Sequence, residues 1–399
     1  MPRLFALTSA APLSVRVRSR ECCTYLYRVI QFVGWLPPRR GTKRYVYLIW
    51  SCLAFGFSTF YLVVGFAVSL VMDFKKFTPG EFLSVFPVFL NVIGLMVKNI
   101  MGIVLLKRLN DTELILDVLD EQLQRESDRR KIHKAVANCN FVFTVYGRLY
   151  LGYTLSVFLT GVFNGQPPWL IYNPLFDWRD SFTHLWMQTI LEYIIMFLMA
   201  SIELIVDACP VIFLIIFRAH VDVLKDHIRQ LRSNAYKTED ENYRDLVCCI
   251  LDHKSIIKCC NLMRPFMSLT IFIQFLLIGI VLGVTMINIM YFLDIMHSIS
   301  SIVYLAGILV ESFPFCYLCD LLVEDCDDLC NLLGQSNWID AEPRYKSTLR
   351  IFMHNLQQPI IFVAGGIFLI SMSTNIKMAK FAFSVMTVVQ QMNLAERFK

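Results

Sequence analysis

Seven long apolar stretches dominate this 399-residue chain and decide what it can fold into. An α-helix needs about 20 apolar residues to cross the hydrocarbon core of a bilayer. Only 17% of the residues are charged and the mean hydropathy is +0.54, whereas soluble domains typically carry about 25% charged residues. The sequence therefore predicts an all-α polytopic membrane protein with seven transmembrane helices. The stretches are residues 45–72, 80–106, 136–163, 182–217, 265–293, 299–323 and, discontinuously, 351–392.

The distribution of Lys and Arg predicts the orientation of the helices. Segments 1–44, 107–135, 218–264 and 324–350 hold 28 of these residues, whereas the alternate connections and the C-terminal end hold five. Because basic short loops stay on the cytoplasmic side, we expect the N-terminus inside and the C-terminus outside. Segments 107–135 and 218–264 also space Leu, Ile and Val on one helical face, which predicts that transmembrane helices continue into the cytoplasm.

Several functional classes find no support in the sequence. It has no Gly-rich phosphate loop, no His-Glu-x-x-His and no Gly-x-Ser-x-Gly, so we expect neither an enzyme nor a cofactor. The spacings in Cys316-x-x-Cys319 and Cys326-x-x-x-Cys330 also arise on one face of a helix and have no His partners, so we expect no metal. The basic flanks meet anionic lipids, which makes membrane lipids, and not nucleic acid, the expected partner.

The outer halves of the second, third, fourth and sixth membrane helices carry aromatic, Met and small polar residues that favour a ligand pocket. Helical bundles form such pockets as apolar cavities with a few polar groups. Ordinary packing or lipid contact is the alternative for any one residue. Segment 164–180, rich in Pro and Trp, is either an interfacial belt or a lid over the pocket. The candidate residues are Phe82, Phe86, Val88, Phe89, Tyr150, Tyr153, Ser156, Met187, Ile190, Tyr193 and Tyr304.

The last apolar segment, 375–392, contains polar side chains that need partners at membrane depth. Ser384, Val388, Gln391 and Met392 fall within about 100° on one helix face. If several copies surround an axis, Val388 and Met392 form apolar rings and Gln391 a polar ring, and apolar rings close a pore by dewetting. A packing face with its amides bonded to neighbouring helices is the alternative.

Four extended stretches of the chain are TPGEFL at 78–83, PPWLIYNPLFDWRD at 167–180, FMHNLQQPIIFVAGGIF at 352–368 and MAKFAFSVMTVVQQM at 378–392. By these and similar stretches, the chain resembles insect odorant receptors. The resemblance covers almost the whole length, and we expect the protein in the plasma membrane of olfactory sensory neuron dendrites. It implies a cytoplasmic segment 1–44, a body 45–343 with an outer-leaflet ligand pocket, a half-helix and pore helix within 344–392, and an extracellular tail 393–399.

The resemblance also implies a mechanism and partners. Family members assemble with a shared co-receptor subunit as heteromeric tetramers, and small volatile odorants open their non-selective cation channel. By this resemblance, Val388, Gln391 and Met392 map onto the co-receptor's gate positions, and Ser384 belongs to the same pore-lining pattern. The Tyr that follows in the family pattern is replaced here by Val385, which leaves the packing partner of that position open.

Three alternative assignments are considered. A metabotropic seven-helix receptor would have an outside N-terminus and usually an Asn-Pro-x-x-Tyr motif near the end of its last helix. A secondary transporter would show internal repeats and more acidic residues deep in its helices than Glu192, Glu203, Asp207 and Glu311. A gustatory receptor channel of the same superfamily is the nearest rival, and the stretches quoted above favour the odorant family.

Overall fold

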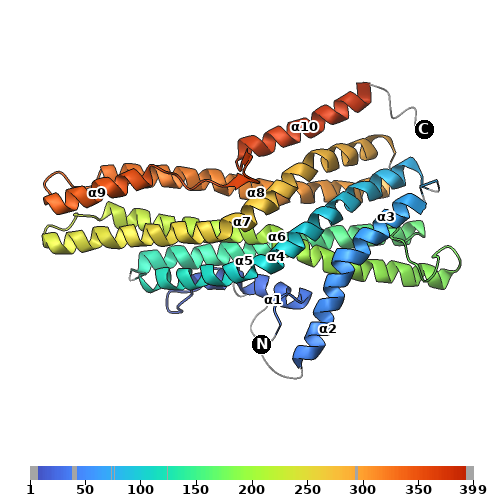
Figure 1. The fold of residues 1–399 in the computed structure, drawn as a ribbon, viewed down its shortest axis with the longest axis horizontal. Coiled ribbons are helices and arrows are strands. Elements are labelled where there is room, and N and C mark those ends of the chain that lie inside the picture. Colours follow the sequence, from blue (N-terminus) through green and yellow to red (C-terminus); the bar gives the residue numbers. More distant parts are fainter. Residues whose placement is uncertain are drawn as a thin grey trace.

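Long helices run side by side to form an elongated bundle in this computed structural model (Figure 1). It describes residues 8–37, 43–72, 74–75, 77–123, 125–292 and 295–391. In chain order, the elements are η2 (Ser19–Cys23), α1 (Thr24–Val33), α2 (Lys43–Phe55), the π-helical turn η3 (Gly56–Tyr61), α3 (Leu62–Met72), α4 (Pro79–Glu121), α5 (Glu126–Asn164), α6 (Phe182–Arg229), α7 (Glu239–Tyr291), α8 (Ile295–Gly334), α9 (Pro343–Leu356), β1 (Val363–Ala364), β2 (Phe368–Leu369) and α10 (Met372–Gln391).

Among the described residues, six helices are long and apolar enough to cross a bilayer, the first being α2, η3 and α3 together. They overlap the first six predicted spans, with the fifth and sixth differing by two residues at one end. The helix α10 occupies the seventh stretch, and Lys377 and Lys380 make it less apolar than the others. The predicted break in that stretch is a short hairpin of β1 and β2, turned by Gly365 and Gly366 at φ of 58° and 74°. Only glycine adopts such angles at little cost.

The helices α4 to α8 extend well past their apolar portions, as segments 107–135 and 218–264 predict for α4 to α7. On these extensions the predicted apolar stripes are buried, with Leu116 on α4 and Val221 on α6 both 0% exposed. The helix α6 lies at the centre of the bundle and contacts α5, α7 and α8. The extensions therefore cover each other's stripes and continue the main core past the apolar portions of the helices.

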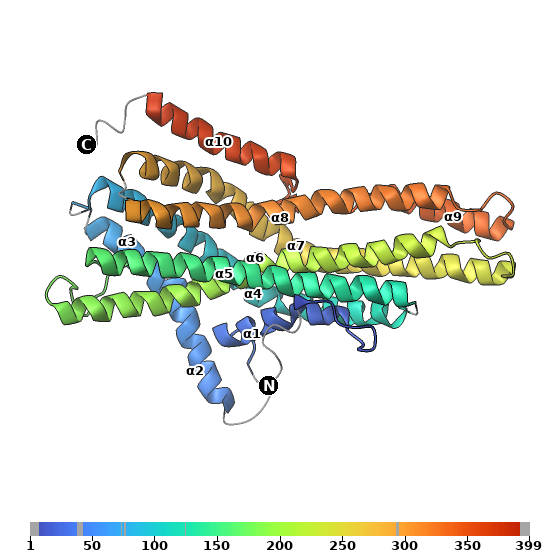
Figure 2. The ribbon, with the colours of Figure 1, turned by 180° about the vertical axis from the view of Figure 1, so that it is seen from behind.

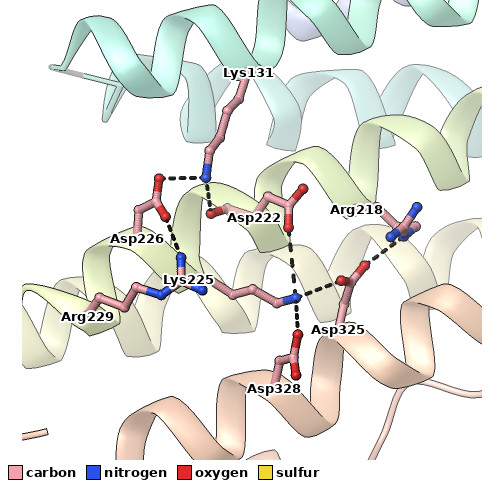
Figure 3. Close-up of polar contacts among 8 residues, drawn as sticks. All are labelled: Lys131, Arg218, Asp222, Lys225, Asp226, Arg229, Asp325 and Asp328. Atoms are coloured by element: carbon pink, nitrogen blue, oxygen red, sulfur yellow. Dashed lines mark hydrogen bonds and ion pairs between the residues drawn. The ribbon is translucent and has the colours of Figure 1, made fainter.

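Charged residues of α5, α6 and α8 tie these extensions together (Figure 3). Lys225 Nζ lies 2.7 Å from Asp325 Oδ1 and 2.9 Å from Asp328 Oδ2. Arg218 Nε donates to the other oxygen of Asp325 at 2.6 Å, and Lys131 Nζ donates to the carbonyl of Asp222 at 2.8 Å. Because the side chains of Lys225 and Asp325 are less than 10% exposed, these contacts are protected from solvent and fix the helix ends relative to one another.

The N-terminal segment docks on the same part of the bundle. Ser19 donates its backbone N–H and its hydroxyl to the two carboxylate oxygens of Asp120 on α4, each at 2.6 Å. The Ser19 hydroxyl also lies 2.9 Å from His220 Nε2 on α6. At the other side of the molecule, α10 packs on α7 and α8 and then extends away from the bundle (Figures 1 and 2).

Candidate ligand-binding site

A cavity of about 380 Å³ lies among the ends of four long helices, at the opposite end of the bundle from α9 (Figure 1). The start of α4, the end of α5, the end of α7 and the start of α8 form its walls, and the loop after α5 closes it. The start of α4 is fixed by a capping box, in which Thr78 and Glu81 each bond the other's backbone N–H and Pro79 occupies the first turn. The TPGEFL stretch at 78–83 therefore forms the N-terminal cap and first turn of α4.

Glu192 of α6 holds the loop over the cavity from one side. Its carboxylate accepts hydrogen bonds from the backbone N–H groups of Trp169 and Ile171, both at 2.8 Å, and from Gln188 Nε2 at 2.7 Å. The side chain is 1% exposed. A buried carboxylate needs hydrogen-bond donors, and buried backbone N–H groups need acceptors. Glu192 and the loop backbone each supply the hydrogen-bond partners that the other needs.

The first membrane helix holds the same loop from the other side. Ser69 donates to the carbonyl of Leu170 at 2.6 Å, and Tyr61 donates to the carbonyl of Tyr172 at 3.2 Å. Leu170 has a φ of 54°, which is unusual for a residue other than glycine. Trp169 and its neighbouring prolines line the cavity. The structure thus favours the lid interpretation for this part of the loop.

Four of the predicted ligand-binding residues lie together. Val88, Tyr153 and Tyr304 line the cavity. The same three residues, with Tyr150, line a smaller cavity of about 30 Å³. The rings of Tyr153 and Tyr304 lie 5.2 Å apart, so α5 and α8 meet at the boundary between the two cavities.

The other predicted residues do not line either of these two cavities. Phe86 stacks on Phe82 with ring centres 5.7 Å apart, and Phe89 packs against the main core. The Ser156 hydroxyl donates to the carbonyl of Tyr153 at 2.8 Å, and so bonds its own helix.

Three further predicted residues lie along α6, away from the cavities. Tyr193 packs against Phe158 and Phe197. Met187 and Ile190 are each 51% exposed, on the outside of this single chain. That outward position is the one expected of side chains that contact lipid.

The sequence-based search missed the contribution of α7. Thr285 and Asn288 line the cavity, yet α7 was not among the helices expected to form it. The two residues are three positions apart in an apolar stretch, so they share a helix face. That spacing was the signal available in the sequence. Ser84 is a further polar lining residue that the sequence does not single out, whereas Trp169 belongs to the segment expected to form either a lid or an interfacial belt.

Buried charged and polar residues next to the smaller cavity join five helices, α4 to α8. Lys98 of α4 donates to Asp207 of α6 at 3.2 Å and to Gln274 of α7 at 2.7 Å. Tyr150 of α5 donates to Asp207 at 2.9 Å and to Glu311 of α8 at 3.1 Å. Gln274 also donates to Glu311. Glu203 completes the group, and its carboxylate lies within 4.8 Å of those of Asp207 and Glu311.

Of the predicted gate residues, Ser384, Val388 and Gln391 lie on α10. The Ser384 hydroxyl donates to the carbonyl of Lys380 at 3.1 Å, and Val388 is 52% exposed in the single chain. Phe381 and Phe383 are also more than half exposed. Met392, the tail 393–399 and the side chain of Gln391 lie outside the described residues.

Known proteins resemble the chain over nearly its full length. Odorant receptor 59b of Drosophila melanogaster is 52% identical over 99% of this chain and 100% of that protein, and Odorant receptor 42b of the same organism is 47% identical over 99% of each. The insect olfactory receptor OR5 from Machilis hrabei shares the fold at 16% identity, with a TM-score of 0.77 over 94% of this chain and 98% of that chain.

A second structure of OR5, in complex with eugenol, gives a TM-score of 0.73 over 94% of this chain and 99% of that one, again at 16% identity. The family profile described as "7tm Odorant receptor" matches residues 78–383. These findings confirm the resemblance identified in the sequence, the all-helical membrane fold and the non-enzymatic class. The chain belongs to the insect odorant receptor family.

Proposed function

We propose that this chain is the odorant-binding subunit of a ligand-gated cation channel and that the 380 Å³ cavity takes a small, neutral, largely apolar molecule. The observation that carries the proposal is the cavity itself. It combines apolar and aromatic walls with polar groups from each of the four helices and a closing loop, and small-molecule sites likewise combine an apolar concavity with polar groups. The structure of the related fold in complex with eugenol supports the same assignment.

A ligand in this cavity opens the channel by favouring one arrangement of the helices. Burial of its apolar surface contributes roughly 25 cal/mol per Å², and only the difference in affinity between closed and open arrangements shifts the equilibrium. Tyr153 and Tyr304 form the boundary with the smaller cavity. We therefore expect the ligand to act first on the contact between α5 and α8.

The buried charged residues provide a physical connection from there to α10. Tyr150 and Glu311 of the smaller cavity bond each other, and Glu311 bonds Gln274 of α7. One turn further along α7, Gly279 lies so close to α10 that a Cβ placed on it would be 3.0 Å from the ring of Phe381. A shift of α8 or α7 is thereby passed to α10 through packed contacts.

The channel is formed with a shared co-receptor subunit, in a tetramer whose pore is lined by α10 and its equivalents. The exposed side chain of Val388 supports this arrangement, because an apolar side chain left exposed on a helix needs a partner surface or lipid. Ser384, one turn earlier on α10, is exposed as well. Gln391 and Met392 complete the proposed gate. The site of action is the plasma membrane of olfactory sensory neuron dendrites.

Patch-clamp recording from cells that express the chain with and without the co-receptor tests the proposal. We expect odorant-evoked, non-selective cation currents only when the chain is present. Tyr153→Ala should change the rank order of ligands, whereas Tyr236→Ala, at a side chain that is 97% exposed and far from the cavity, should not. An identical ligand profile for Tyr153→Ala would remove this cavity from the proposal.

A further inference from the structure

The helix α10 packs one face against the bundle and leaves the opposite face exposed. Asn375 is 0% exposed, and its Nδ2 donates to Cys316 Sγ of α8 at 3.4 Å. Met378, three positions further on, packs against the apolar core. At about 100° per residue, these two side chains lie about 180° and about 120° away from Ser384. The face centred on Ser384 therefore points away from the bundle.

This exposed face carries two lysines. Viewed along the helix axis, four residues fall within about 80° of one another: Lys377, Lys380, Ser384 and Val388. All four are exposed in the single chain. Lys380 precedes Ser384 by one turn, and its carbonyl accepts the Ser384 hydroxyl. The two lysines therefore belong to the same face as the residues proposed to line the pore.

Neither of these lysines is neutralised within the described part of the chain. The ammonium groups of Lys377 and Lys380 have no carboxylate partner among the described residues. Asp320 of α8 contacts the start of α10, but its carboxylate accepts from the backbone N–H of Met372 at 2.9 Å. Each copy of the chain in a channel therefore adds two positive charges to the space that this face borders.

We propose that Lys377 and Lys380 line the pore on the cytoplasmic side of the gate and lower its permeability to divalent relative to monovalent cations. At about 1.5 Å per residue, Lys380 lies roughly 12 Å before Val388 along α10. In the predicted orientation, with the C-terminus outside, both lysines are thus cytoplasmic to the proposed gate. This inference rests on the proposed pore face of α10 and specifies which ions pass along it.

Rings of charged side chains set the ion selectivity of channels through their Coulomb energy. The energy of an ion beside an ammonium group is proportional to the charge of the ion. The repulsion of Ca²⁺ is therefore twice that of Na⁺ at the same position. Salt screens the interaction over about 8 Å at physiological ionic strength, so only charges that border the permeation path contribute. A lysine that reached lipid phosphates instead would leave the permeability of the pore unchanged.

The test measures the permeability ratio of Ca²⁺ to Na⁺ from the reversal potentials of odorant-evoked currents, in cells that express the chain with the co-receptor. Wild type is compared with Lys377→Gln/Lys380→Gln, which removes both charges, and with Lys377→Arg/Lys380→Arg, which keeps them. The matched control is Lys254→Gln, because Lys254 is exposed on the extension of α7. It lies roughly 37 Å along that helix from Gly279, where α7 meets α10.

Removal of both charges should raise the ratio at least about two-fold, while the Arg variant and Lys254→Gln should keep the wild-type ratio. Lys380→Gln alone should raise the ratio by a smaller factor, and it stays informative if the double variant does not reach the surface. An unchanged ratio in the neutral variants, or an equal change in the Arg variant, contradicts the inference while odorant-evoked currents persist. If a wide odorant panel evokes no current in wild type although the chain reaches the surface, the proposed function itself fails, and the inference fails with it.

Discussion

Glu192 is the side chain whose alteration most selectively releases the loop that closes the cavity. The change Glu192→Gln keeps the shape and volume but replaces one acceptor oxygen by an NH2 group. In the structure both oxygens are used, Oε2 by the N–H of Trp169 and Oε1 by the N–H of Ile171 and by Gln188. At least one buried backbone N–H group must therefore lose its acceptor.

A buried hydrogen bond to a charged group contributes about 1.5–3 kcal/mol. Its loss should therefore lower the equilibrium constant for docking of the loop by roughly 10- to 100-fold. The bonds from Ser69 and Tyr61 remain, so the loop stays partly held. The EC50 of an agonist should rise by up to the same factor, because only the docked fraction binds fully.

The assay is the agonist concentration–response curve, with surface expression measured in parallel. Glu324→Gln, at an exposed position of α8, is the matched control. An unchanged EC50 in Glu192→Gln at normal surface expression would refute the reasoning that this carboxylate holds the loop and that the loop completes the binding site.

Two further predictions follow from backbone and charge contacts. Gly161→Ala places a Cβ 2.9 Å from the Cα of Pro168, so the loop must move and agonist potency, measured from the evoked currents, should fall. In the control Gly152→Ala on the same helix, the added Cβ meets no atom within 4 Å, so agonist potency should not change. Lys98→Met should lower stability by about 3–5 kcal/mol, because it leaves the buried carboxylate of Asp207 without its ammonium. We expect Lys98→Met to have a lower melting temperature in detergent than wild type. The double variant Lys98→Met/Asp207→Asn should recover most of this loss. Equal melting temperatures of Lys98→Met and wild type would contradict the prediction.

The sequence predicts the helices better than the cavity, and the reason is physical. Runs of apolar residues predict where helices form and how long their apolar portions are. The apolar stripes in the basic flanking segments correctly predict that α4 and α6 continue past these portions. An apolar helix in a membrane has little polar contrast around its circumference, however, so the pattern does not say which face points inward. Met187 and Ile190 lie on α6 but are each 51% exposed.

The residues that were missed illustrate the same limit. Thr285 and Asn288 are isolated polar positions in α7, and only the packing of α4 and α8 against that helix makes them part of a cavity. The acidic residues of α6 and α8 were noticed in the sequence, but their convergence on Lys98 depends on the rotation of three helices. The role of Trp169 depended on the path of the loop, since Trp and Pro suit both a lid and an interfacial belt.

The most direct test of the central claim is agonist protection of a cysteine placed inside the cavity. Val88 lines the cavity, so Val88→Cys, expressed with the co-receptor, is exposed to a small neutral thiol reagent and the loss of odorant-evoked current is followed with time. The chain without this change and Tyr236→Cys report the background. We predict that agonist slows modification at Val88→Cys over the concentration range that opens the channel and has no effect at Tyr236→Cys. A modification rate at Val88→Cys that is independent of a saturating agonist would contradict the account.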